Sequence, residues 1–231
     1  MNSIGVGITT RNRREVFSRS YEQWRKFLPF GAKLVVVDDS SDIPCPVADY
    51  RFDTQQGIAK AKNKALSLVD DCRHVFLVDD DVYPTRPDWY VPYINTGLKH
   101  MCLSFERNSK GQRLSHNVFL KRKTPEYWIY NAPNGCMLYL ENTVLDAVGG
   151  MDSSFDVWGY EHVAWSHRIH NAGLTPYPFM DVADSLKYFH VSDYYGEVQS
   201  SVPQADRVRS IRANTPLYEA AKKSSAYIDY K

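Results

Sequence analysis

Three consecutive carboxylates, Asp79, Asp80 and Asp81, directly follow the apolar run His74–Val78 and precede Pro84. Like charges this close repel one another, so a positive group is expected beside them. Alternate residues of an extended segment face the same side, which puts Asp79 and Asp81 together. Oxygen ligands suit hard divalent cations, so the cluster indicates a site for Mg²⁺ or Mn²⁺. The alternative is a solvated acidic turn that caps a following helix.

Polar residues also follow two other apolar runs. Ile4–Thr9 leads into Thr10-Arg11-Asn12-Arg13, and Leu34–Val37 leads into Asp38-Asp39-Ser40-Ser41-Asp42. Both runs have the composition of buried parallel strands. Ligands bind at the carboxyl ends of strands in open α/β sheets, so the three polar segments are expected to meet at one sheet edge.

Helical patterns separate these strands. Glu15–Leu28 carries apolar residues at helical spacing and ends at Pro29, and Ile58–Val69 is rich in Ala, Lys and Leu. The order strand, helix, strand, helix, strand predicts an α/β fold with a Rossmann-like, mostly parallel sheet flanked by helices.

The second half alternates less regularly. Tyr83–Tyr130 carries four prolines and predicts short helices and irregular strands. Order returns with a strand at Cys136–Leu140 and helices at Asn142–Val148 and Glu161–Asn171, and Thr215–Lys231 predicts a terminal helix and tail. We expect one domain over 1–231, with a more regular first part at about 1–82, a second part at about 83–200 and a C-terminal helix and tail at 201–231.

Five segments fall in the order and spacing of one family. They are Gly7-Ile8-Thr9-Thr10-Arg11-Asn12-Arg13, Val36-Val37-Asp38-Asp39-Ser40-Ser41-Asp42, Gln56-Gly57-Ile58-Ala59-Lys60-Ala61-Lys62-Asn63, Asp79-Asp80-Asp81 at a DxD position, and Gly149-Gly150-Met151-Asp152 through Trp158-Gly159-Tyr160-Glu161-His162 to Arg168. The set resembles the GT-A-fold, nucleotide-sugar glycosyltransferases of the family-2 inverting type. Its last segment is also similar to the Trp-Gly-Gly-Glu segment of polypeptide N-acetylgalactosaminyltransferases. The resemblance covers residues 4 to about 190.

The resemblance implies an enzyme of the hexosyltransferase type, with a nucleotide-binding half at about 1–82 and an acceptor-binding half at about 83–200. It would transfer a sugar from a nucleotide diphosphate sugar, UDP-sugar first, to an acceptor hydroxyl with Mn²⁺ or Mg²⁺ as cofactor. Asp39 would accept a hydrogen bond from the base, and Lys62, where arginine is usual, would neutralise a phosphate unless it is only an exposed helix charge. The residues implied in nucleotide or donor binding are Thr9, Thr10, Arg11, Asp39, Lys62, Asp79 and Asp80.

The pair Glu161-His162 departs from the family pattern. In inverting relatives a carboxylate at the second position deprotonates the acceptor. His162 would serve as the general base here, because histidine titrates near neutral pH. The retaining N-acetylgalactosaminyltransferases have no base at this position, so both stereochemical outcomes stay open. Glu161 and Trp158 would face the acceptor or the sugar. The alternatives are that Glu161 and His162 are first-turn residues of a helix and that Trp158 is a core residue.

His190 lies in Tyr188-Phe189-His190-Val191, about where many of these enzymes place a third metal ligand. We therefore expect Asp79, Asp81 and His190 to hold the metal. The alternative is a histidine packed among aromatic residues of the core.

Composition limits the protein's partners and location. Its 28 Lys+Arg and 27 Asp+Glu give a net charge of +1, which argues against binding nucleic acid or membranes by bulk charge. We expect no membrane span, because no apolar stretch approaches roughly 18 residues. Met1–Thr10 does not look like a signal peptide, so we expect a soluble, cytoplasmic protein. The spacing of the four cysteines predicts no metal cluster.

Two segments are nevertheless basic. Glu106–Glu126 and Arg207–Lys231 each hold six Lys or Arg against two Asp or Glu, an excess of +4. An anionic acceptor is therefore a further expectation, with ordinary solvated faces as the alternative. Two other functions stay open. One is a nucleotidyltransferase acting on sugar phosphates, which usually has a glycine-rich loop after its first strand, and the other is an inactive nucleotide- or sugar-binding module.

Overall fold

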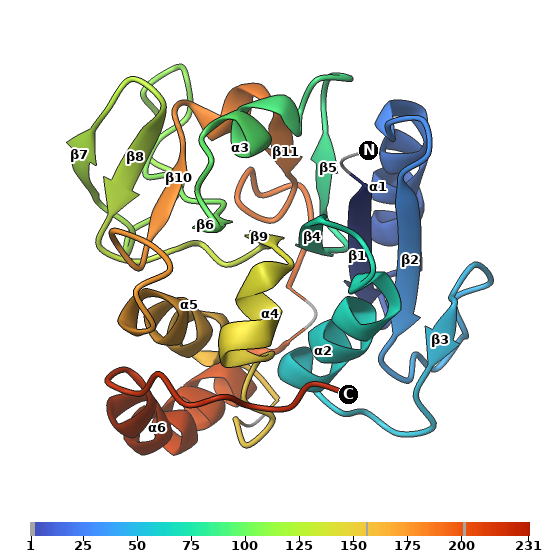
Figure 1. The fold of residues 1–231 in the computed structure, drawn as a ribbon. Helices are drawn as coiled ribbons and strands as arrows, with labels where there is room; N and C mark the ends of the chain where they lie inside the picture. Colours follow the sequence, from blue (N-terminus) through green and yellow to red (C-terminus); the bar gives the residue numbers. More distant parts are fainter. Residues whose placement is uncertain (1–2, 156, 201) are drawn as a thin grey trace.

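The computed structural model describes residues 3–155, 157–200 and 202–231 (Figure 1). Met1 and Ser201, where the predicted nucleotide-binding half and the predicted tail begin, lie outside these residues. A central sheet has the strand order β3-β2-β1-β4-β9-β6. Its first four strands are parallel, β9 is antiparallel to β4, and β6 is antiparallel to β9. The predicted mostly parallel α/β sheet is confirmed. Its strands are β1 (Ile4–Thr10), β2 (Lys33–Asp38), β3 (Tyr50–Arg51), β4 (His74–Asp79), β6 (His100–Cys102) and β9 (Met137–Glu141).

Helices cover both faces of this sheet. Residues of α1 share one buried core with β1 and β4, and residues of α2, α4 and α5 share the other. The helices are α1 (Arg14–Phe27), α2 (Ile58–Val69), α3 (Val91–Asn95), α4 (Thr143–Val148), α5 (Glu161–Asn171) and α6 (Gln204–Ala221), with the 3₁₀ helix η1 (Ser185–Lys187). In Figure 1, α6 lies beside α5 at the lower edge of the molecule.

Two small sheets complete the fold. One pairs β5 (Val82–Pro84) with β11 (Phe189–Val191), and the other has the order β10-β8-β7. The strands of the second sheet are β7 (Leu120–Lys123), β8 (Tyr127–Tyr130) and β10 (Met180–Val182). The short elements expected between Tyr83 and Tyr130 are confirmed. None of the helices in the described ranges is long and apolar enough to cross a bilayer.

A close approach between α2 and β1 positions the site. A Cβ atom added at Gly7 would lie 2.9 Å from Cβ of Ala65, so only glycine lets the helix pack this near the strand. Lys62 is one helical turn before Ala65 and reaches Asp79 at the end of β4, where its Nζ lies 2.7 Å from Oδ1. Packing of the sheet thus delivers a buried cation to the acidic cluster.

The C-terminal helix begins earlier than the sequence predicts. Proline is common in the first helical turn, which makes Thr215-Pro216 resemble a helix start. In the structure Pro203 precedes the helix and Pro216 lies inside it, so the predicted start at Thr215 is wrong.

Candidate active site

A cavity of about 310 Å³ opens at the carboxyl ends of β1, β2 and β4. The strand ends contribute Thr10, Asp39 and Asp79 to its wall. The opposite wall comes from the chain around the start of α6, including Pro203 and Arg207. Of the donor-binding residues expected from the sequence, those that line this cavity are Thr9, Thr10, Arg11, Asp39, Asp79 and Asp80.

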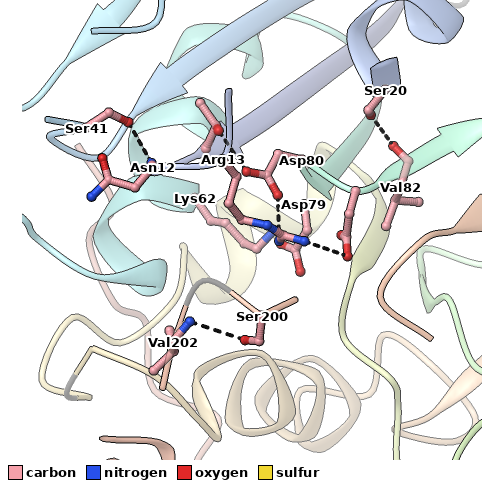
Figure 2. Close-up of polar contacts among 12 residues, drawn as sticks. Asn12, Arg13, Ser20, Ser41, Lys62, Asp79, Asp80, Val82, Ser200 and Val202 are labelled. Atoms are coloured by element: carbon pink, nitrogen blue, oxygen red, sulfur yellow. Dashed lines mark hydrogen bonds and ion pairs between the residues drawn. The ribbon is translucent and has the colours of Figure 1, made fainter. Parts of the chain in front are cut away.

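Two cations hold the three consecutive carboxylates (Figure 2). Arg13 donates from Nη1 to Asp80 Oδ1 at 2.8 Å and from Nη2 to Asp81 Oδ2 at 3.3 Å. Lys62, whose side chain is 2% exposed, pairs with Asp79, whose side chain is 36% exposed. Lys62 does not line the cavity itself and lies behind Asp79, so it is not the exposed helix charge considered from the sequence. Asp79 is thus the member of the cluster most open to a ligand.

The deeper carboxylates are held in a desolvated environment. Burial raises the pKa of Asp80 to about 7, against the opposing effects of the Arg13 charge and of a hydrogen bond that Thr10 Oγ1 donates to Oδ2 at 2.7 Å. The pKa of Asp81 is also raised, by burial and then by the charge of Asp79, with a further contribution from Asp193. Both carboxylates are therefore harder to ionise than a free aspartate, an effect that a further cation beside them would oppose.

Asp38 and Asp39, adjacent in sequence, serve different purposes. Asp38 is fully buried and accepts backbone N–H bonds from Ser41 and Cys45, which shapes the loop after β2. Asp39 lines the cavity and accepts backbone N–H bonds from Gln56 at 2.7 Å and Gly57 at 2.9 Å. Burial raises the pKa of Asp39, although these two bonds oppose the effect. Its carboxylate is thereby fixed in orientation at the cavity wall.

The chemistry of these donors fits a hard divalent cation. Asp79, Asp81 and Asp193 present carboxylate oxygens at one cavity, and their mutual repulsion is what such an ion would relieve. No group of three His, Cys, Asp or Glu side chains that could hold a metal is found within the described parts of the chain. One or two carboxylates would therefore hold Mg²⁺ or Mn²⁺, with substrate phosphates and water as the remaining ligands.

His190 is not brought to this cluster. It lies opposite Tyr83 in the antiparallel pair of β11 and β5, so both side chains occupy the same face. Its ring stacks on Tyr83 at 5.0 Å and on Tyr195 at 4.7 Å, and Nε2 lies 2.9 Å from Glu197 Oε2. The expected ligand set of Asp79, Asp81 and His190 is therefore not assembled, because strand pairing turns the imidazole into an aromatic stack.

The first turn of α5 holds Glu161 and His162. Neither residue is among those lining the cavity. Glu161 is buried with its Oε1 3.1 Å from His162 Nδ1, so it does not face the acceptor side as expected. His162 is 17% exposed at its side chain and packs against Gly135. Gly135 lies between the cavity-lining residues Asn134 and Cys136, so the imidazole lies directly behind that stretch of wall.

Trp158 lines the cavity, as the expected contact to acceptor or sugar requires. The guanidinium of Arg207 lies 5.0 Å above its ring, and Arg207 Nη2 also donates to Ser200 Oγ. The indole is therefore covered on one face by α6.

Several cavity residues are not predicted from the sequence. Arg13 lies in the first of the five motifs, but the resemblance assigns it no role, and Asn134, Asp193 and Arg207 lie outside the motifs. The sequence does hold a signal for Asp193, because this residue follows a short apolar strand as the other site residues do. The sequence holds no such signal for Arg207, because its place in the cavity depends on where α6 begins.

The chain is similar to known proteins in its three-dimensional structure. No protein-family model and no curated protein matches the chain. Among solved structures, GalNAc-T7 with UDP, GalNAc and Mn²⁺ superposes with a TM-score of 0.60 at 14% identity, covering 100% of this chain and 52% of that one. The mannosyltransferase PcManGT from Pyrobaculum calidifontis with GDP-Man and Mn²⁺ gives 0.55 at 16% identity over 74% and 53%. S. aureus TarS 1–349 gives 0.55 at 12% identity over 90% and 69%.

The chain has the GT-A glycosyltransferase fold. The match spans about half the length of the GalNAc-T7 chain, at 52%, and of the PcManGT chain, at 53%. The GT-A fold expected from the sequence motifs is confirmed at the level of architecture.

Proposed function

We propose that the protein is a glycosyltransferase of the hexosyltransferase type. It transfers a sugar from a nucleotide diphosphate sugar, with UDP-sugar as the favoured donor, to an acceptor hydroxyl. The observation that carries this proposal is the convergence of Thr10, Asp39 and Asp79 on one cavity backed by the buried cation of Lys62. The ligands named for GalNAc-T7 and PcManGT support a nucleotide-sugar donor and a divalent cation.

The donor spans the cavity from its base to its sugar. Asp39 accepts a hydrogen bond from the base, with Thr9, Thr10 and Arg11 around the nucleoside. Asp79 and Asp81 would hold Mn²⁺ or Mg²⁺, which when bound would supply positive charge to the leaving nucleoside diphosphate. Lys62 adds a second positive charge behind the phosphates.

His162 is the general base of the reaction, and its imidazole must act from behind the cavity wall at Gly135. Its imidazole takes the proton of the acceptor hydroxyl while the acceptor oxygen bonds to the anomeric carbon and the bond from that carbon to the phosphate oxygen breaks. The nucleoside diphosphate leaves with the bonding electrons. A base acting on the acceptor supports inversion at the anomeric carbon. Trp158 offers an apolar ring face to a sugar at the cavity wall.

Charge supports an anionic acceptor, or one carried on an anionic polymer. β7 has three consecutive exposed bases, Lys121, Arg122 and Lys123, and α6 adds exposed Arg209 and Arg212. Transfer to such an acceptor should weaken steeply between low and physiological salt. A rate that does not change with salt would remove this part of the proposal.

The activity is tested by incubating the protein with a panel of nucleotide sugars and Mn²⁺ and separating the products. Release of nucleoside diphosphate, by transfer to an added acceptor or to water, supports a transferase. Release of pyrophosphate would instead identify a nucleotidyltransferase. If no donor gives a product or a thermal shift, neither a glycosyltransferase nor a nucleotidyltransferase is supported, and the proposal is rejected.

A further inference from the structure

The environment of Glu161 is unusual for a carboxylate. Its side chain is 4% exposed, and Oε1 meets His162 Nδ1 at 3.1 Å. The other oxygen, Oε2, is buried without a hydrogen-bond partner. Burying a carboxylate costs free energy even when it is paired, so the contact with His162 is weak evidence for a purely stabilising role.

The carboxylate is nevertheless ionised. Burial by itself would raise the pKa of Glu161, but the hydrogen bond and charge of His162, together with backbone N–H groups at the start of α5, outweigh burial and leave the pKa below its ordinary value. An ionised Glu161 can only accept a hydrogen bond. Nδ1 of His162 must then carry a proton, so in the neutral imidazole the lone pair is on Nε2.

The turn before α5 fixes this geometry. Gly159 and Tyr160 both have left-handed backbone angles, with φ of 102° and 73°, which bend the chain so that Glu161 enters the interior. Tyr160 is held there by parallel stacking on Tyr218 of α6 at 4.5 Å. Asn214 of α6 donates to the carbonyl oxygen of Gly159 at 2.8 Å and to that of Trp158 at 3.1 Å.

The other titratable group facing His162 is His100 of β6. His100 is fully buried, and burial lowers its pKa to about 4, with a smaller contribution from the charge of His162. It is therefore neutral at physiological pH. Its Nε2 pairs with Ser166 Oγ at 2.9 Å, and that hydroxyl donates to the backbone carbonyl of His162. Glu161 thus faces the imidazole without a competing cation at His100.

We propose that Glu161 is a positioning residue that acts through His162. It fixes the tautomer with the proton on Nδ1, so that Nε2 receives the acceptor proton, and its charge stabilises the imidazolium that forms. This inference rests on the proposed function for its catalytic consequence. It replaces the expectation that Glu161 contacts sugar or acceptor.

Two variants separate the orientation from the charge. Glu161→Leu removes the acceptor of the Nδ1 hydrogen bond, and Glu161→Gln keeps an acceptor oxygen but removes the charge. Nitrogen-15 NMR of the histidine ring should show the Nδ1–H tautomer of His162 in the unaltered protein and in Glu161→Gln, and its loss in Glu161→Leu. Glu219→Gln, on the exposed face of α6, is the matched control and should change nothing.

Kinetics test whether Glu161 works through the base. Glu161→Gln should lower kcat on the order of tenfold or more with little change in KM for donor, and Glu161→Asp should restore part of the loss. In a His162→Asn background, Glu161→Gln should have no further effect on kcat. An equal loss in that background, or an unchanged tautomer in Glu161→Leu, would overturn the inference. If the protein transfers no sugar at all, the proposed function fails, and the NMR result still decides the pairing.

Discussion

Gly135 controls the space available to the proposed base. Its φ is +83°, and a Cβ atom built there would lie 2.6 Å from both Cδ2 and Cε1 of His162, with Nε2 closer still. Gly135→Ala therefore forces either strain or a movement of the imidazole. The left-handed backbone costs an L-residue about 1–2 kcal/mol. Overpacking against the ring adds about 1–3 kcal/mol, for a total of about 2–5 kcal/mol.

Gly173→Ala is the matched control. Gly173 has a similar φ of +76° at the end of α5, but no atom lies within 4 Å of a Cβ built there. Gly173→Ala should lower the free energy of unfolding only by the cost of the left-handed backbone, about 1–2 kcal/mol. Thermal unfolding measures both, at roughly 2–4 °C per kcal/mol for a chain of this size. Transfer should be unchanged in Gly173→Ala and should fall on the order of 100-fold in Gly135→Ala, because the base is displaced.

A double-mutant cycle tests the contact itself. With His162→Ala already present, the ring is gone and Gly135→Ala should cost no more than Gly173→Ala does. Equal destabilisation by the two alanine variants in the unaltered protein, together with normal kcat in Gly135→Ala, would refute the placement of His162 against this wall.

Three further predictions concern the donor end of the site and the buried carboxylates. Asp79→Asn should abolish the gain in nucleotide affinity that Mn²⁺ provides in calorimetry while a hydrogen bond to Lys62 keeps the fold; an unchanged gain would exclude Asp79 as a metal ligand. Asp39→Ala should weaken the binding of free UDP as much as that of a UDP-sugar, since the proposed contact of Asp39 is to the base, and a loss confined to the sugar-bearing donor would contradict that role. Asp181 is fully buried, and burial raises its folded pKa to about 7. Its contribution to the free energy of unfolding is therefore full below an unfolded pKa of about 4 and is lost as the pH rises through about 7. Denaturant unfolding should show a smaller fall in the free energy of unfolding over this pH window in Asp181→Asn than in the unaltered protein.

The elements of residues 1–82, the predicted nucleotide-binding half, could be predicted from the sequence because their signals are local. Apolar periodicity and Ala-rich composition define α2 at Ile58–Val69, with the same bounds in the structure as in the prediction. The partner of each side chain is not local. Arg13 meets Asp80 across 67 positions of sequence, a pairing that follows only from the parallel register of β1 and β4.

Side-chain positions in residues 83–200, the predicted acceptor-binding half, were harder to predict because they depend on contacts between distant segments. His190 follows the family spacing, yet the pairing of β11 with β5 turns it toward Tyr83. Glu161 has the right neighbours in sequence, but its burial depends on two left-handed residues held by α6. Motif order therefore identified the segments that meet, and strand pairing and helix docking decided which atoms face the cavity.

The hold of α6 on the turn before α5 has a consequence for the order in which the site matures. Asn214 lies more than 50 residues after the carbonyl groups that it binds, and Arg207 and Pro203 supply one wall of the cavity. The N-terminal part of a chain leaves the ribosome first. The central sheet and its acidic cluster therefore emerge before α6, which holds the turn before α5. A nascent chain can thus form the acidic edge of the sheet before α6 adds its wall of the cavity and holds the turn before α5.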